Sequence, residues 1–401
     1  MKKFLCFVLL SITSAVTAQN VTENKLSFSY TQLPLTPLDK STSKYKIAVE
    51  RHFEKANEDS LLAYQARLEA AQIKYEAELA DWQTKRDATL RDYFTKMAAW
   101  QKAVNAGETI QKPLAPLVPQ KPIIDEVLEP QLHADIEDTK VDGFFNLQGY
   151  DKGEGGALVT VSINPIGNLK FDSKISGSGA TTKYEYFVRY TMPVNIKVED
   201  PFKGTVWQTI LFNKTRTYSI NTYGSQYEHD LWLIDNRENF WAKFESDVRN
   251  STLKDVNKEL NDNCGFPVYN HATEIYTVKR HKDHEHNDLV NAYSAAVQGY
   301  KLIAQELDHS AAESKLREAI KIWEIALTES KVNDNKARIN DKITALIYCN
   351  IANAQIWLNE FDAADTNLNL ALSLNINKFK RIANGLKATA ERNKRRFNAN
   401  K

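Results

Sequence analysis

Cysteine is scarce in this sequence, which limits how the fold can be stabilised. The 401 residues include 3 cysteines, of which Cys6 lies in an N-terminal leader that we expect to be removed. The remaining pair, Cys264 and Cys349, is too small for a framework of disulfide bonds. Nothing in the sequence brings the two together, so we expect free thiols, with Cys349 as a small buried side chain on a helix.

An excess of charge of one sign is also missing. Without Lys2 and Lys3 of the leader, 50 basic residues stand against 51 acidic ones, a net charge of −1 with histidine neutral. Proteins that bind nucleic acid are normally strongly basic, so we do not expect nucleic acid as a partner. Beyond the leader, no apolar run approaches the roughly 18 residues of a membrane-spanning helix, so we expect no transmembrane span.

Signatures of catalysis are missing as well. The sequence contains no G-x-S-x-G elbow, no H-E-x-x-H pair, no P-loop and no dinucleotide fingerprint. We therefore expect a protein that is not an enzyme and that needs no cofactor.

The chain opens with the pattern of a secretory signal over residues 1–18. Two lysines precede an apolar stretch that ends near Ile12, and small residues at Val16-Thr17-Ala18 form a cleavage site. The pattern predicts export, to a bacterial periplasm, to the outer membrane or to the cell surface.

Residues 54–106 contain neither proline nor glycine, and their apolar residues recur with the period of a straight helix, about 3.6. At 1.5 Å per residue this helix would be roughly 75 Å long, longer than a compact domain of this size is wide. We therefore expect a rigid helical arm that projects or lies along a partner. The stripe comprises Leu61, Tyr64, Leu68, Ala71, Tyr75, Leu79, Trp82, Thr89, Tyr93, Met97, Trp100 and Val104, with Arg86 as its one charged member.

Residues 107–140 are rich in proline and are expected to form a strap along the arm. Prolines 113, 116, 119 and 122 are three residues apart, which is the period of polyproline II. We predict that the strap returns along the helix and covers part of the stripe with Leu114, Leu117, Ile123 and Val127. The alternative is a proline-rich ligand for an aromatic groove of a partner.

The fold class predicted for the whole chain is α+β with several domains. Residues 19–43 are an extended lead-in. Residues 44–53 and 141–235 have the alternation and the turns of short strands, and we expect an antiparallel β-sandwich into which the arm is inserted after the first strand. One strand places Tyr184, Tyr186 and Tyr190 on a common face. Such a face can bind sugars, which gives the alternative function of a carbohydrate- or cell-surface-binding module.

Residues 236–287 form a mixed linker segment, with a helix expected from about Phe240 to Leu260. The linker contains three histidines among carboxylates, which could gather a divalent metal ion such as Zn²⁺. A solvated linker is the competing interpretation. The candidate metal ligands are His281, His284 and His286.

Residues 288–401 show helical periodicity and resemble tetratricopeptide repeats. The residues at the family's large, small and aromatic positions are Tyr348, Ala352, Phe361, Ala364, Leu368 and Ala371. The sequence departs from the family at Ile376, where the family has proline, and in a 45-residue separation of Ala319 and Ala364 that exceeds the family period of about 34. The resemblance implies a groove that binds a peptide or protein, and a plain helical bundle is the alternative. The groove residues we expect are Tyr300, Trp323, Tyr348 and Gln355.

The C-terminal segment is strongly basic. Residues 378–401 contain nine Lys or Arg and one acid, Glu391. Lys394, Arg395 and Arg396 are therefore candidates for contact with an anionic surface, although a solvated outer face of the last helix would have the same composition. Taken together, the sequence favours an exported, non-enzymatic scaffold or adaptor that binds a protein or peptide partner, or joins an assembly, in the bacterial envelope.

Overall fold

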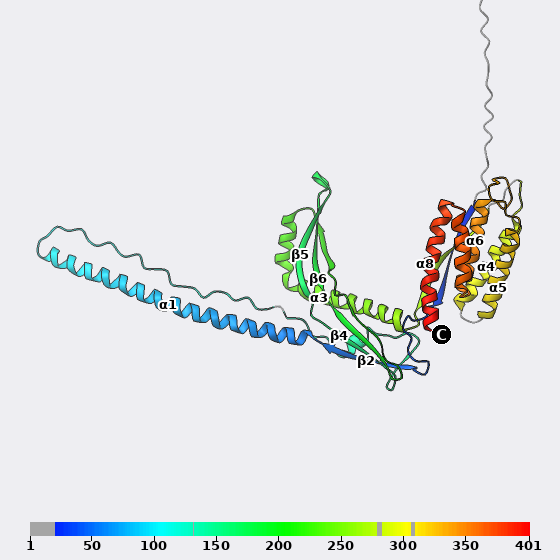
Figure 1. Ribbon diagram of the computed structural model, residues 1–401. Helices are drawn as coiled ribbons and strands as arrows, with labels where there is room; N and C mark the ends of the chain where they lie inside the picture. The colour runs from blue at the N-terminus through cyan, green and yellow to red at the C-terminus, as the bar shows by residue number, and fades with distance from the viewer. Residues whose placement is uncertain (1–20, 131, 279–282, 306–308) are drawn as a thin grey trace, which may run out of the picture.

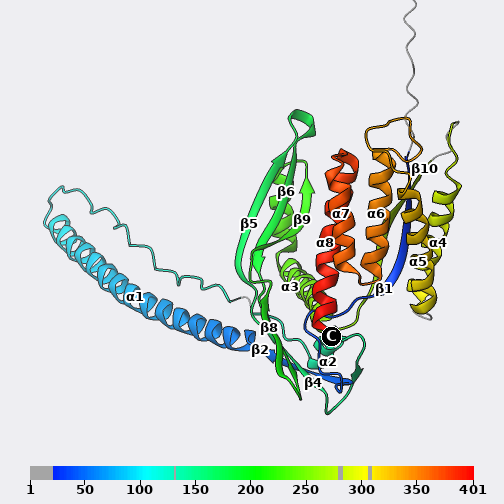
Figure 2. The same ribbon diagram turned by 45° about the vertical axis from the view of Figure 1, so that its right-hand side comes forward.

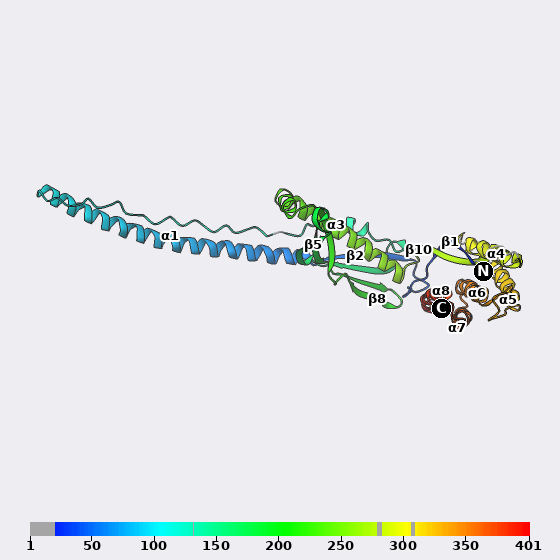
Figure 3. The ribbon, with the colours of Figure 1, turned by 90° about the horizontal axis from the view of Figure 1, so that it is seen from above.

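A computed structural model describes residues 21–130, 132–278, 283–305 and 309–401, so the signal-peptide prediction lies outside the described residues. The protein is mixed α+β, with a long helix near the N-terminus and a helical region at the C-terminus. Figure 3 shows three parts in a row: the arm, a β region and the helical region. No helix in the described ranges combines the length and apolar character needed to cross a membrane.

The arm is formed by helix α1 (Phe53–Asn105), which starts directly after strand β2 (Lys44–Arg51). It projects from the β region with an extended segment beside it (Figure 1). The helix is followed by Gly107, whose φ of +86° lies in the left-handed region that glycine adopts without strain. The predicted insertion of a single long helix after this strand is confirmed.

The β region contains two sheets, and their arrangement corrects the prediction of an antiparallel sandwich. Strand β2 pairs in parallel with β4, because the chain leaves along the arm and returns before β4 begins. The five-stranded sheet has the order β3-β2-β4-β7-β8 and is therefore mixed, while the three-stranded sheet has the order β5-β6-β9. Their bounds are β3 (Asp151–Lys152), β4 (Ala157–Ile163), β5 (Gly167–Ser176), β6 (Lys183–Thr191), β7 (Val194–Asp200), β8 (Gly204–Leu211) and β9 (Arg216–Tyr223). Two short helices, α2 (Asp138–Asp142) and η1 (Gly179–Thr181), lie between these strands.

Helix α3 (Gln226–Cys264) packs into the core of the β region. It is 39 residues long, much longer than the predicted helix from Phe240 to Leu260. Its residues Phe244, Val248 and Leu260 share a core with the buried strand residues of the region. The segment predicted as a mixed linker is thus partly a core helix of the β region.

Strands β1 (Val21–Thr31) and β10 (Val268–Val278) form an antiparallel pair that belongs to the helical region. This corrects both the extended lead-in and the rest of the predicted linker. The side chain of Asn350 accepts a hydrogen bond from the Tyr276 amide (3.0 Å) and donates one to the Tyr276 carbonyl (2.7 Å). A helix side chain therefore pairs with the backbone N–H and C=O of Tyr276 at the edge of β10, where a third strand would otherwise bind.

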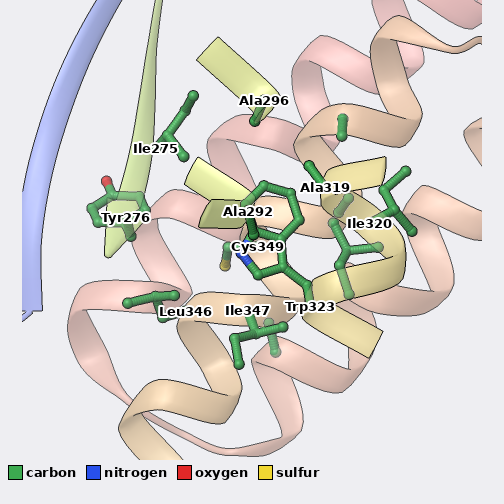
Figure 4. Close-up of a cluster of buried hydrophobic side chains, with 14 of the residues drawn as sticks. Ile275, Tyr276, Ala292, Ala296, Ala319, Ile320, Trp323, Leu346, Ile347 and Cys349 are labelled. Atoms are coloured by element: carbon green, nitrogen blue, oxygen red, sulfur yellow. The ribbon is translucent and has the colours of Figure 1, made fainter. Parts of the chain in front are cut away.

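The helical region consists of α4 (Asn287–Gln305), α5 (His309–Leu327), α6 (Asp341–Trp357), α7 (Phe361–Ser373) and α8 (Asn377–Ala399), which lie around the β1–β10 pair (Figure 2). Small residues allow close packing: a Cβ added to Gly299 would lie 2.8 Å from Leu316. Figure 4 shows Trp323 surrounded by alanine and isoleucine side chains. On α5 the residues Leu316, Ala319, Ile320, Trp323 and Ala326 are buried.

Helix α6 begins at Asp341, directly after a capping residue. The side chain of Asn340 accepts a hydrogen bond from the amide of Ile343 (3.1 Å) and so caps α6 at its N-terminus. The preceding loop is held by Arg338, which pairs with Glu329 (2.6 Å) and Asp288 (2.9 Å).

Candidate functional site

The strap returns along α1 in an extended conformation, as predicted. The indole N–H of Trp82 donates to the Pro119 carbonyl (2.8 Å), and Lys74 pairs with Asp125 (2.7 Å). Most residues of the predicted stripe are half-buried, among them Tyr75, Leu79 and Trp82. Its members Leu61, Leu68 and Val104 are exposed. From the body to the tip, hydrogen bonds join Asn57 to His133, Lys74 to Asp125, Trp82 to Pro119 and Trp100 to Ile110.

The side chains that cover the stripe differ from the prediction. Pro113 and Pro116 are half-buried against the arm, whereas Leu114, Leu117 and Ile123 point away and are 83%, 96% and 86% exposed. Polyproline II repeats every three residues, so a side chain next to each inward proline falls on another face. Of the predicted covering residues, only Val127 is half-buried.

The arm carries much of the exposed apolar surface of this protein. Fourteen of the 27 exposed large apolar side chains in the described residues belong to α1 and the strap. They are Leu61, Leu62, Leu68, Ile73, Phe94, Val104, Ile110, Leu114, Leu117, Val118, Ile123, Ile124, Leu128 and Leu132. Apolar surface gathered in this way is typical of an interaction surface.

A cavity of about 490 Å³ lies where the helical region meets the β region. We call it the junction cavity. It is bounded by the end of β1 and the segment after it, by the neighbouring ends of α4 and α5, and by α6 and α8. Its lining consists of Tyr30, Thr31, Gln32, Leu33, Ile303, His309, Ile356, Trp357, Asn359, Asn393 and Arg396.

An aromatic cluster forms one wall of the junction cavity. The ring of Trp357 lies 4.9 Å from that of Tyr30 and 5.0 Å from that of His271. Burial, and then the charge of Arg392, lowers the pKa of His271, because both disfavour the imidazolium. His271 supports the Trp357 ring from outside the lining of the cavity and is uncharged at neutral pH.

Arg396 anchors the polar side of the cavity and corrects its predicted role. It is buried, pairs with Asp262 of α3 (2.8 Å), and donates to the carbonyls of Leu33 and Asp262 (2.7 Å each). It joins the helical region to the β region, so it is not available to an anionic surface. Of the other two candidates, Lys394 pairs with Asp362 (2.7 Å) and Arg395 is exposed.

The residues predicted to line a repeat groove do not form one surface. Tyr300 and Trp323 are each 1% exposed and belong to the core, because the small residues around them let the helices close over their rings. Gln355 is buried and accepts a hydrogen bond from Asn367 (2.9 Å), and Tyr348 is half-buried. The first two are thus corrected from partner contacts to core residues.

The predicted histidine cluster is only partly described. His281 lies outside the described residues. The Nε2 atom of His284 lies 2.8 Å from the Lys336 carbonyl, and His286 is 5% exposed. Over the described ranges, no group of three or more His, Cys, Asp or Glu side chains is arranged to hold a metal ion.

Two tyrosines of the predicted β6 face pack against neighbouring aromatic rings. Tyr190 is buried, with its ring edge-on to Phe244 at 5.6 Å, and Tyr186 meets Tyr223 edge-on at 6.2 Å. Sugar-binding platforms require exposed rings, so this arrangement does not favour the carbohydrate-binding alternative.

Both described cysteines are buried and free, as expected. Burial raises the pKa of Cys264 to about 11 and that of Cys349 to about 12, so both thiols are protonated at neutral pH and unreactive.

Sequence reasoning missed most of the junction cavity, because its residues come from segments far apart in the chain. One local signal was available: Leu26, Phe28 and Tyr30 alternate with polar residues, which is the period of a strand. That strand brings Tyr30 to the cavity.

Comparisons with known proteins place the chain in no family. No family model matches it, and neither a curated protein nor a solved structure does. The comparisons therefore provide no evidence for an enzyme family.

Proposed function

We propose that this protein is an exported, non-enzymatic scaffold or adaptor of a bacterial envelope, and that it binds a segment of a partner protein in the junction cavity. The observation that carries the proposal is the cavity itself. Its volume of about 490 Å³ falls within the range of roughly 300–1,000 Å³ typical of ligand sites.

The chemistry of the lining supports a peptide ligand. Tyr30 and Trp357 offer apolar surface for a side chain, while Gln32, Asn359 and Asn393 offer amides that can pair with peptide groups. The described lining contains no carboxylate and no cysteine, and its histidine, His309, lies exposed at the start of α5. Aromatic rings and amides make up much of the rest of the lining, which is a composition suited to binding a peptide.

Two buried donors strengthen this interpretation. The indole N–H of Trp357 and the Nε–H of Arg396 have no acceptor among the described residues. Buried donors without acceptors are costly. Carbonyl groups of an entering peptide are suitable acceptors once the side chains around these donors move aside.

The proposal extends the repeat-like interpretation of the C-terminal region. Ala352, Ala364 and Ala371 are buried where two helices approach closely, as the family pattern requires, and α6 and α7 are joined by only three residues. Stacked helical hairpins of this kind form a concave surface to which a peptide can bind. The predicted secretory signal is the basis for the location.

Photo-crosslinking with two matched asparagines tests the proposal. A photoreactive residue replaces Asn393, which lines the cavity, or Asn384, which is exposed on the same helix outside it. In the native host we expect one discrete adduct with a different protein from position 393 and none from position 384. Equal labelling from both positions, or none from position 393, would contradict the proposal.

A cavity-filling variant provides a second test. Asn393→Trp should block the site and remove the adduct formed from a photoreactive residue at neighbouring Asn359. Asn384→Trp, with the same side chain outside the cavity, should leave it unchanged.

A further inference from the structure

We propose that the arm pairs with the arm of a second copy of this chain, antiparallel, so that the tip of each arm lies on the base of the other. This inference is independent of the junction cavity. It rests on how charge and exposed apolar side chains are distributed along α1 and the strap.

Charge is separated along the arm. The contact between Trp82 and Pro119 divides it into a half near the body and a half near the tip. The half near the body (53–81 and 120–130) contains ten acids and four bases, and the half near the tip (82–105 and 107–119) contains six bases and three acids. The net charges are therefore −6 and +3.

Compensation of the helix dipole does not explain this separation. Such compensation acts within the first and last turns of a helix, whereas the acids extend to Glu76, Glu78 and Asp81. The strap has no helix dipole, and yet its acids Asp125 and Glu129 also lie in the half near the body.

The charge pattern selects an orientation for pairing. Parallel arms would place −6 beside −6, whereas antiparallel arms place each acidic half beside a basic half, twice by symmetry. A partner with a reversed copy of the same pattern complements the whole length of the arm. A second copy of this chain is such a partner.

The arm also has apolar surface away from the strap, which a partner can bury. Leu62, Ile73 and Phe94 are 64%, 61% and 64% exposed. Their separations of 11 and 21 residues are close to three and six turns, so the three lie on one side of α1.

The size of the arm is sufficient for a stable pair. A helix of 53 residues is about 80 Å long and about 10 Å wide, and so offers a strip of about 800 Å². Stable protein interfaces bury about 800 Å² on each partner.

Disulfide trapping tests the orientation. Gln65, Gln83 and Gln101 are exposed and 18 residues apart, about five turns, so they lie on one face of α1. Antiparallel pairing centred near Gln83 predicts that Gln83→Cys forms a disulfide with itself. It also predicts that Gln65→Cys forms one with Gln101→Cys only when the two proteins are mixed. Cys264 and Cys349 are buried and do not interfere.

Two results of the trapping experiment would overturn the proposal. Self-linked Gln65→Cys and self-linked Gln101→Cys, with no mixed product, would mean that the arms are parallel. A monomer at micromolar concentration in light scattering, with no disulfide in any sample, would mean that the arms do not pair.

A matched pair of variants tests the contribution of the apolar surface. Ile73→Ser on the arm should raise the dissociation constant of the dimer at least tenfold. Ile325→Ser on α5, where the side chain is 58% exposed compared with 61% for Ile73, should leave it unchanged. The Asn393 adduct should persist in both variants, so failure of arm pairing can be distinguished from failure of the proposed adaptor function. Equal dissociation constants for the two variants would contradict the proposal.

Discussion

Helices α1 and α6 differ greatly in how far they are buried. Of the 53 residues of α1 only Phe53 is buried, whereas α6 buries 13 of its 17. Helix α6 is surrounded by α5, α7, α8 and strand β10. Helix α1 is accompanied by a single extended strap, which half-buries its stripe and leaves its other sides open.

The difference shows that periodicity identifies which face of a helix is apolar, while burial depends on what lies against that face. In the helical region the partners belong to the same chain, so the stripes disappear into a core that holds Trp323 and Tyr300. On the arm, the same kind of stripe is covered mainly by prolines, and leucines of the strap turn outward. The helical region thus buries its apolar residues within its own core, whereas the arm leaves many of them exposed.

Among the substitutions that test this difference between the two regions, we expect Trp323→Ala to have the largest effect on stability. The ring is 1% exposed among closely packed small residues, so its loss should lower the free energy of unfolding by about 3–5 kcal/mol. Urea denaturation followed by circular dichroism measures the change. A loss below about 1 kcal/mol would mean that the site collapses around the cavity.

Arg396→Met should have the next largest effect, because Arg396 lies where the two regions meet. The change removes the pair with Asp262 and the bonds to two carbonyls. Because Asp262 keeps some access to water, we expect a loss of about 2–3 kcal/mol. Arg395→Met is the matched control, since Arg395 is exposed, and should change stability by no more than about 0.5 kcal/mol. Equal effects of the two variants would exclude the anchoring role of Arg396.

Trp82→Ala is the counterpart of Trp323→Ala on the arm and should have a smaller effect. It removes the hydrogen bond to the Pro119 carbonyl and the stacking with Arg86. We expect a loss in global stability of about 1 kcal/mol or less, since a net hydrogen bond contributes about that much. Proteolysis of the strap near Pro119 should become faster, while cleavage in the helical region should not change. Unchanged cleavage near Pro119 would show that Trp82 does not hold the strap.

The smallest expected effect is on the pH dependence of stability, and it concerns His271 in the helical region. The folded state lowers the pKa of His271, so the unfolded state binds the proton more readily. Stability associated with His271 is present above its ordinary pKa, near 6.5, and is lost as pH falls through the lowered value. His271→Phe keeps an aromatic ring without this titration. Denaturation midpoints measured between pH 7.5 and 5 should decline less in the variant than in the unchanged protein, and equal declines would contradict the prediction.

Much of the architecture could be predicted from the sequence, because it depends on local pattern. The uninterrupted period of 3.6 specified α1, the proline spacing of three specified the strap, and small residues such as Ala319 and Ala364 specified where helices pack closely. These features need only the backbone geometry of a helix or of polyproline II, which neighbouring residues decide.

Only the tertiary structure decided which surfaces these elements share. It paired β1 with β10 across some 250 residues of sequence. It also packed α3 into the core of the two-sheet β region and buried Arg396, which composition had placed on the surface. The junction cavity arises from the same long-range contacts. Such contacts depend on which distant segments exclude water from one another. The local pattern of apolar and charged residues does not specify which segments these are.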